Sequence, residues 1–270
     1  MTAIVKWVEL PNSVRLPYTE RGDLSGTPLL LLHGFADSLR SFELVLPHLP
    51  VFIRAIALTQ RGHGDASRPT TGYRVSDFAA DLAAFMDALH LEVAFIAGAS
   101  FGGLVAQRFA MDHPERVLGL ALIGSPVTLA GKPQVREAWD STISKVSDPI
   151  DPEFVRRFVA NTVAPTAPQS FVEILVQESL KVPASVWKAA ATEGFLKNDF
   201  TAELHKVKAP TLIIWGDRDT LTQDDQGTLL TAITNSRRVV YDGGGHTLIA
   251  EEPERIAADL ATFVRSIISR

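Results

Sequence analysis

Ser100 stands in a short segment that can make a serine hydroxyl reactive. It is the central residue of Gly98-Ala99-Ser100-Phe101-Gly102, which matches the pattern G-x-S-x-G. The pattern alone is weak, because three fixed positions in five residues recur by chance. Here an apolar run at residues 93–97 precedes it and a helical pattern at 104–111 follows it, which is the strand–turn–helix context of a nucleophile elbow. The sequence therefore predicts an exposed nucleophile on a strained turn, against the alternative of an ordinary glycine-rich turn.

A serine hydroxyl needs an adjacent base, and the base needs an acid that orients it. His246 lies in Gly243-Gly244-Gly245-His246-Thr247, just after the last apolar run, and such a loop allows the imidazole to return over the sheet edge. The acid is expected after the preceding strand, where Asp217 and Asp219 are both candidates. We favour Asp219 because it lies further into the loop. Asp217 would then be a turn residue or a partner of Arg218.

The remaining histidines and Asp242 are expected to have structural roles. Asp242 directly follows its own strand. Two histidines precede Ser100 in the chain and lie in other loops at the sheet edge, namely His33 and His63. Four lie in helices or at helix ends, namely His48, His90, His113 and His205.

Stabilising a tetrahedral intermediate requires two N–H donors aimed at its oxyanion. One is expected from the backbone of Phe101, directly after Ser100. The other is expected from the loop that follows the apolar run 29–32, where the best candidate is the backbone N–H of Phe35.

Short apolar runs alternate with helical patterns along most of the chain. Strands are expected at residues 4–9, 14–20, 29–32, 52–58, 93–97, 118–123, 211–215 and 237–241, and helices at 78–89, 104–111 and 254–268. This alternation predicts a mostly parallel sheet covered on both faces. Between 127 and 204 helical stretches follow one another, which predicts an all-helical cap on a core domain formed by 1–126 and 205–270.

Composition excludes several other classes of protein. The 270 residues include no cysteine, which rules out a disulfide framework, a thiolate metal site and a cysteine nucleophile. The net charge of −5, without basic runs, argues against binding to nucleic acid or to an anionic membrane surface. No targeting segment and no apolar stretch of membrane-spanning length is found, so the cytoplasm is the expected location.

Taken together, these motifs resemble those of the α/β-hydrolase superfamily, and the resemblance covers nearly the whole chain. It rests on His33-Gly34-Phe35, Arg61-Gly62-His63-Gly64, the segment 98–103, His113-Pro114-Glu115-Arg116-Val117, the turn 216–219 and Gly245-His246. The resemblance implies a mostly parallel eight-stranded sheet flanked by helices, and a Ser–His–Asp hydrolase without a cofactor. No cluster of metal-ligating residues is apparent in the sequence, so no metal site is expected. Arg61–Gly64 resembles a structural turn of that family.

Residue types narrow the choice among the branches of the superfamily. A serine rather than an aspartate at the elbow, and the lack of tyrosine in the cap region, argue against haloalkane dehalogenases and epoxide hydrolases. We favour an esterase acting on small, largely apolar acyl substrates through an acyl-enzyme. The alternatives are a lactone or enol-lactone hydrolase, a carbon–carbon bond hydrolase, a cofactor-free haloperoxidase or perhydrolase, and a non-catalytic small-molecule receptor. The expected partner is a small ester or lactone, and the chain is expected to be a monomer or homodimer.

Cap aromatic residues are candidates for the substrate pocket, above all Trp139 and Trp187. Four phenylalanines are weaker candidates, namely Phe154, Phe158, Phe171 and Phe195. An aromatic residue on such a helix more often packs in the core of the cap. Three arginines could hold a substrate carboxylate or form a solvated face, namely Arg136, Arg156 and Arg157.

Overall fold

The computed structural model describes residues 4–164 and 166–269. Its strands are β1 (Lys6–Glu9), β2 (Arg15–Arg21), β3 (Thr27–Leu32), β4 (Ile53–Leu58), β5 (Ala94–Ala99), β6 (Val117–Ile123), β7 (Thr211–Gly216) and β8 (Ser236–Tyr241). Its α-helices are α1 (Val75–Ala88), α2 (Phe101–Asp112), α3 (Pro133–Ser141), α4 (Pro152–Ala160), α5 (Gln169–Leu180), α6 (Ala184–Ala189), α7 (Asp225–Ala232), α8 (Leu248–Glu251) and α9 (Pro253–Ile268). Each expected strand and helix has its counterpart among these elements.

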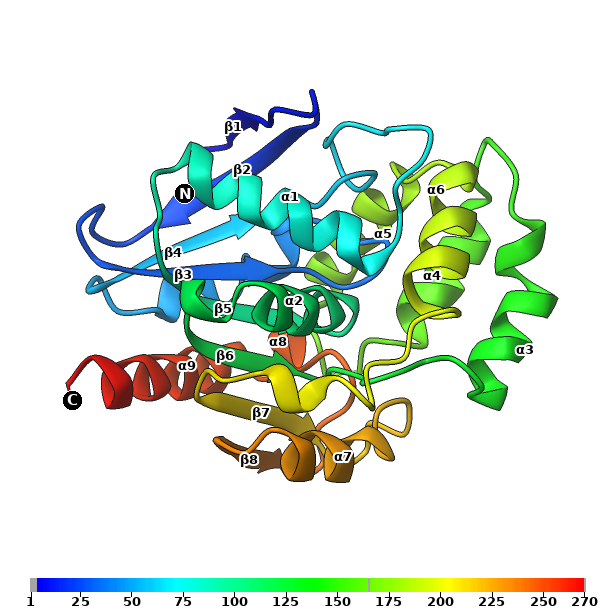
Figure 1. The fold of residues 1–270 in the computed structure, drawn as a ribbon. Helices are drawn as coiled ribbons and strands as arrows, with labels where there is room; N and C mark the ends of the chain where they lie inside the picture. Colours follow the sequence, from blue (N-terminus) through cyan, green and yellow to red (C-terminus); the bar gives the residue numbers. More distant parts are fainter. Residues whose placement is uncertain (1–3, 165, 270) are drawn as a thin grey trace.

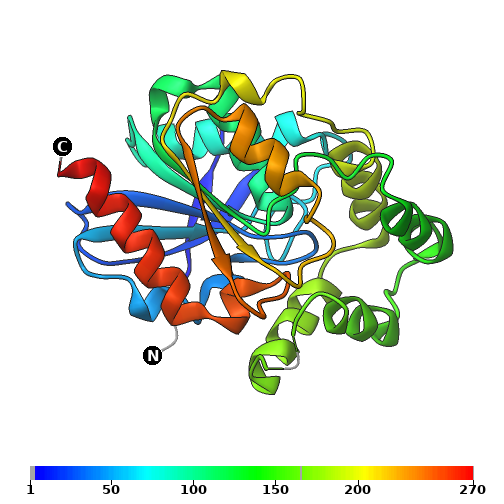
Figure 2. The same cartoon turned by 90° about the horizontal axis from the view of Figure 1, so that it is seen from below.

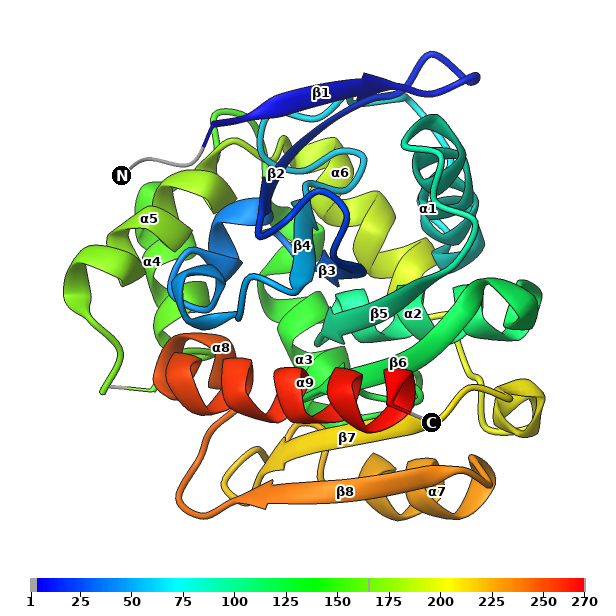
Figure 3. The ribbon, with the colours of Figure 1, turned by 90° about the vertical axis from the view of Figure 1, so that its left-hand side faces the viewer.

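The strands form a single eight-stranded sheet in the order β1-β2-β4-β3-β5-β6-β7-β8. Figure 3 shows them from β1 at the top to β8 at the bottom. β2 pairs antiparallel with β1 and with β4, and the other neighbours run parallel. The predicted mostly parallel sheet is thereby confirmed.

The four-leucine run of β3 explains how the sheet is buried on both faces. Successive side chains of a strand point to opposite faces. Leu30 and Leu32 belong to the hydrophobic layer that contains α1 and α2, whereas Leu29 and Leu31 belong to the layer that contains α9. Figure 2 shows the sheet between α9 and the helices of the other face. A continuous apolar run is therefore the correct signature for this central strand.

The chain between β6 and β7, called the inserted segment from here on, supplies helices α3 to α6. A π-helical stretch at Ala190–Phe195 extends α6. An isolated antiparallel bridge joins Thr128 to Asp199 near the two ends of the segment. In Figure 1 the arrowheads of β3, β6 and β7 point toward these helices, so the inserted segment lies at the carboxyl ends of the strands. That edge is where open α/β sheets bind ligands.

A buried ion pair fastens the turn that follows β4 to helix α1. Arg61 donates from Nε to Asp81 Oδ2 at 2.6 Å and from a terminal nitrogen to Oδ1 at 2.5 Å, and it also donates to the carbonyl of Gly72 at 2.8 Å. The two side chains are 8% and 4% exposed. Because each of the three guanidinium nitrogens donates a hydrogen bond within the fold, we assign this turn a structural role, as the family resemblance implied. Across the described residues, no helix is both long and apolar enough to cross a membrane.

Removing one member of that pair should destabilise the fold strongly. Asp81→Ala leaves the Arg61 guanidinium buried without its counter-ion, and we expect a loss of about 3–5 kcal/mol in the free energy of unfolding, measured by urea denaturation. The control is Asp87→Ala on the same helix, where the carboxylate is 68% exposed and pairs with Arg116. That change should cost less than about 1 kcal/mol, and equal losses for the two variants would contradict the assignment.

Candidate active site

Ser100 occupies a sharp turn between β5 and α2. Its backbone has φ +50° and ψ −118°, which is strained for a residue with a side chain. The neighbouring glycines make the turn sterically possible. A Cβ at Gly98 would lie 2.2 Å from the carbonyl oxygen of Gly102, and a Cβ at Gly102 would lie 2.3 Å from that of Leu32. The G-x-S-x-G pattern therefore has a physical cause, and the turn directs Ser100 toward a cavity at the sheet edge.

Two loops bring a histidine and an aspartate to Ser100. His246 lies between β8 and α8, and its Nε2 is 2.9 Å from Ser100 Oγ. Asp219 follows β7, and its Oδ2 is 2.9 Å from His246 Nδ1. With the carboxylate accepting a hydrogen bond from Nδ1–H, Nε2 is left free to accept the serine proton. The arrangement can thus activate the Ser100 hydroxyl as a nucleophile.

The Asp219 carboxylate is deeply buried and well supplied with donors. It accepts hydrogen bonds from the Leu221 N–H at 3.0 Å and from Thr222 Oγ1 at 2.6 Å. Burial alone would raise its pKa, but the hydrogen bond and charge attraction of His246, together with Thr222 and Leu221, hold the pKa below its ordinary value. The group is therefore a carboxylate at neutral pH, as required to orient an imidazole.

Asp217 has a different place. Its Oδ1 accepts the N–H of Gly243 at 2.8 Å, so it links the loop after β7 to the loop that carries His246. Asp242 is exposed at the end of β8. Of the two candidate acids, the structure places Asp219 at His246 and Asp217 in a turn contact.

The expected oxyanion donors lie on two sides of the serine. Phe101 is the first residue of α2. The loop with Phe35 passes close by, since a Cβ on Gly34 would lie 3.6 Å from the Ser100 Cβ. Buried hydrogen bonds hold this loop: His33 Nε2 accepts the N–H of Gln60 at 2.9 Å, and Ser179 Oγ donates to the carbonyl of Ala36 at 2.7 Å. Sequence reasoning missed the supporting roles of Gln60 and Ser179.

A largely apolar cavity of about 450 Å³ opens over Ser100 and His246. Both the sheet edge and the inserted segment line it. Its apolar lining includes Phe35, Phe101, Ile123, Leu129, Val135, Ile143, Phe158, Val159, Leu175, Phe195, Leu221 and Leu248. The cavity thus has the size and character of a site for a small organic molecule.

The two tryptophans proposed for the pocket lie outside this lining. Trp187 is fully buried, and its ring packs edge-on against Phe35 at 5.0 Å and Phe158 at 4.9 Å, so it supports the lining from behind. Trp139 is half-buried and packs against the hydrophobic core. The size of an aromatic side chain predicts that it is buried. Trp187 is buried in the core of the inserted segment and not at the cavity wall.

The three arginines considered for a substrate carboxylate lie away from the described cavity. Arg136, Arg156 and Arg157 are exposed and do not line it, and Arg156 instead pairs with Glu173. Within residues 4–164 and 166–269 there is no cluster of three or more side chains able to ligate a metal ion.

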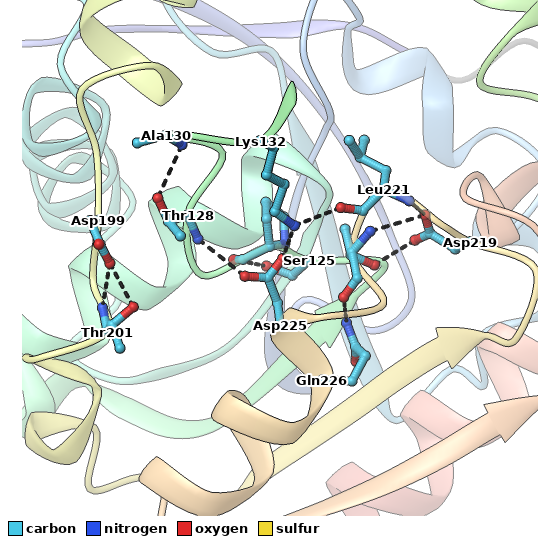
Figure 4. Close-up of polar contacts among 12 residues, drawn as sticks. Ser125, Thr128, Ala130, Lys132, Asp199, Thr201, Asp219, Leu221, Asp225 and Gln226 are labelled. Atoms are coloured by element: carbon cyan, nitrogen blue, oxygen red, sulfur yellow. Dashed lines mark hydrogen bonds and ion pairs between the residues drawn. The ribbon is translucent and has the colours of Figure 1, made fainter. Parts of the chain in front are cut away.

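A lysine of the inserted segment holds the loop that carries Asp219. Lys132, the residue before α3, donates to the carbonyl of Leu221 at 2.7 Å and forms an ion pair with Asp225 of α7. Figure 4 shows both contacts, next to the hydrogen bond from Leu221 to Asp219. The lysine and aspartate side chains are 12% and 6% exposed. The position of Asp219 is therefore tied to the start of the inserted segment.

The acid can be tested through the reactivity of Ser100 itself. Asp219→Asn should lower the rate at which a fluorophosphonate modifies Ser100 by about 10³- to 10⁴-fold, because the amide favours the wrong imidazole tautomer. Asp217→Asn is the matched control and should change the rate by less than about tenfold. The opposite ranking would assign the acid to Asp217.

The lysine contact can be tested by removing its charge. Lys132→Met leaves Asp225 buried without a counter-ion, and we expect a loss of about 3–5 kcal/mol in the free energy of unfolding together with slower modification of Ser100. Adding Asp225→Leu should restore most of the stability, because no unpaired charge then remains. Lys145→Met, at an exposed position of the inserted segment, should change neither quantity, and an unaffected Lys132 variant would contradict this role.

Comparisons with known proteins identify the fold family of the chain. Residues 27–253 match the family model described as the alpha/beta hydrolase fold. The chain is 29% identical to a poly(3-hydroxyalkanoate) depolymerase from Ectopseudomonas oleovorans, over 97% of this chain and 93% of that protein. It is 26% identical to a non-heme chloroperoxidase from Streptomyces lividans, over 96% of this chain and 99% of that protein.

A solved structure is similar to this chain in fold. An esterase from Rhodococcus sp. ECU1013 is 26% identical and superimposes with a TM-score of 0.85, covering 97% of this chain and 99% of that chain. The family match spans most of the sheet, the turn at Ser100 and the loops of Asp219 and His246. The chain therefore belongs to the alpha/beta hydrolase fold family.

Proposed function

We propose that this protein is a serine hydrolase that cleaves small carboxylic esters through an acyl-enzyme. The observation that carries the proposal is the hydrogen-bonded chain from Ser100 through His246 to Asp219, which opens into an apolar cavity. Similarity to an esterase and to a polyester depolymerase supports ester bonds as the target.

The first half of the reaction forms the acyl-enzyme. Ser100 Oγ attacks the ester carbonyl while His246 Nε2 accepts the hydroxyl proton. The negative charge that develops on the carbonyl oxygen is stabilised by the backbone N–H groups of Phe101 and Phe35. Collapse of the tetrahedral intermediate breaks the carbon–oxygen bond, and His246 returns the proton to the leaving alcohol.

The second half releases the acid. Water, deprotonated by His246, attacks the acyl carbon, and the carbon–oxygen bond to Ser100 breaks as the serine regains its proton. Throughout, the Asp219 carboxylate orients the imidazole and stabilises its cationic form. The apolar lining favours acyl and alcohol groups that are small and largely uncharged. The surface position of the three arginines gives no support to a substrate carboxylate, which disfavours a carbon–carbon bond hydrolase.

A second candidate is perhydrolysis by the same residues, favoured by the similarity to a non-heme chloroperoxidase. In that reaction hydrogen peroxide replaces water at the acyl-enzyme and the product is a peracid. The two activities are separated by measuring the ratio of peracid to acid at a fixed peroxide concentration. Lactone hydrolysis would use the same residues and needs no additional catalytic group. It is tested by comparing lactones with linear esters of the same acyl length.

The proposal is tested with p-nitrophenyl butyrate. We expect the wild type to hydrolyse it and Ser100→Ala to lose about 10⁴- to 10⁶-fold in kcat, since the nucleophile is removed. Ser76→Ala, an exposed serine of α1, is the matched control and should keep wild-type kcat. Equal turnover by the wild type and Ser100→Ala would reject Ser100 as the nucleophile, and no turnover by either would favour a small-molecule receptor.

A further inference from the structure

One carboxyl group stands in the wall of the cavity. Asp37 follows the loop that carries Phe35 and lines the same cavity as Ser100 and His246. It is half-buried, and it is the sole acidic side chain among the described lining residues. The proposed mechanism gives it no role.

Among the residues that the structure describes, local contacts give this carboxyl group hydrogen-bond donors but no cation. Its Oδ1 accepts the N–H of Ser38 at 2.9 Å, a contact between adjacent residues. The short helical turn that follows, Leu39–Phe42, is capped by the Ser38 side chain, which accepts the N–H of Arg40. Asp37 is therefore not the capping residue that an aspartate before a helix usually is.

The neighbouring cations are paired with other acids. Arg40 donates to Glu43 at 2.6 Å and lies 3.9 Å from Glu178. Lys181 lies 2.9 Å from Glu178 and 3.0 Å from Asp65. Within the described part of the chain, no lysine, arginine or histidine forms an ion pair with Asp37.

An unpaired acid in such surroundings opposes folding. Burial raises the pKa of Asp37 to about 7, and the nearby Glu178 carboxylate acts in the same direction, against hydrogen bonds from Ser41 and Ser38. Groups perturbed in this way concentrate at functional sites. A ligand that forms a hydrogen bond with Asp37 would offset part of this cost.

A second acceptor stands beside it. Ser179 of α5 also lines the cavity, and its hydroxyl proton is already donated to the carbonyl of Ala36, the residue before Asp37. Toward the cavity Ser179 Oγ can therefore only accept a hydrogen bond. An ionised carboxylate likewise only accepts. Two acceptors from different elements, in an otherwise apolar wall, call for a ligand that brings a hydrogen-bond donor.

We propose that the cavity selects esters that carry a hydroxyl group away from the scissile carbonyl, with Asp37 and Ser179 as the specificity-determining residues that bind it. This inference rests on the proposed ester hydrolysis. A hydroxyl has one proton to donate. It donates that proton to Asp37 when Asp37 is ionised. When Asp37 is protonated, the hydroxyl accepts from the acid and donates to Ser179 Oγ, so it suits both forms of Asp37. An ammonium group would suit the carboxylate alone and would lose more solvation in an apolar cavity.

The test compares matched substrates in two series. The first pairs a p-nitrophenyl ω-hydroxyalkanoate with the alkanoate in which a methyl group replaces the hydroxyl. The second pairs an alkanediol monobutyrate with the corresponding alkyl butyrate. The measured quantity is the ratio of kcat/KM for hydroxyl over methyl ester in the wild type, Asp37→Leu, Asp37→Asn and Ser179→Ala. Asp140→Leu is the control, at an exposed acid of α3 that does not line the cavity.

In at least one series we expect the ratio to fall about tenfold or more in Asp37→Leu, since a charged or polar partner of the hydroxyl is lost. Asp37→Asn, which keeps an acceptor, should retain part of the preference, and Asp140→Leu should show the wild-type ratio. Thermal unfolding should show Asp37→Leu to be at least as stable as the wild type. An unchanged ratio in both series, a destabilised Asp37→Leu, or a wild-type preference for ω-ammonium esters would overturn the proposal.

A binding measurement separates this inference from the proposed reaction. Calorimetric titration of Ser100→Ala, with and without Asp37→Leu, compares the affinities for a hydroxyl ester and its methyl partner in the absence of turnover. Tighter binding of the hydroxyl ester that disappears with Asp37→Leu supports the inference even where the wild type hydrolyses neither compound. Equal affinities contradict it even where ester hydrolysis is observed.

Discussion

The close approach of three backbones at the end of β5 is the constraint on which the rest of the site depends. Gly98 lies against Gly102, and Gly102 lies against the end of β3, with no room for a Cβ at either position. The strained conformation of Ser100 costs on the order of 1–3 kcal/mol. It persists because β5 is buried along its whole length between β3 and β6 and cannot relax without disturbing the centre of the sheet.

A buried neutral histidine, His33, extends this rigidity to the loop of Phe35, the proposed oxyanion donor. Burial, with a further effect of His63, lowers the pKa of His33 well below its ordinary value, so the ring is uncharged near neutral pH. Because its Nε2 accepts the Gln60 N–H, the proton must sit on Nδ1, which faces the carbonyl of Gly34 at 2.7 Å. A fixed tautomer thus holds the residue next to Phe35. A titrating histidine here would make the loop position depend on pH.

The sheet and the meeting of Ser100, His246 and Asp219 could be predicted because their signals are local. Leu29 to Leu32 are apolar at successive positions, and both faces of β3 are buried. Ser100, Asp219 and His246 each follow a strand at the same sheet edge, so their meeting point follows from topology. The contacts of the inserted segment with the rest of the site could not be predicted from the sequence. Lys132 and Leu221 are 89 residues apart and Ser179 and Ala36 are 143 apart, and no periodicity encodes such pairs. The placement of Trp187 in the pocket lining was wrong for a related reason. The size of an aromatic side chain predicts that it is buried, but not whether it lines a cavity or packs behind the residues that do.

Each of the three loops at the site has its own hydrogen bond to the inserted segment. Lys132 holds the loop of Asp219 through Leu221, Ser179 holds the loop of Phe35 through Ala36, and Thr247, beside His246, donates to the carbonyl of Thr162 at 2.6 Å. Any displacement of the segment that admitted a larger ligand would have to break one or more of these bonds, at about 1 kcal/mol for each neutral bond and more for that of Lys132. Substrate size and the alignment of the reacting groups are therefore not independent. A ligand that fits beneath the segment leaves the proposed acid, base and oxyanion donors aligned, whereas one that lifts the segment weakens the contacts that hold these groups in place.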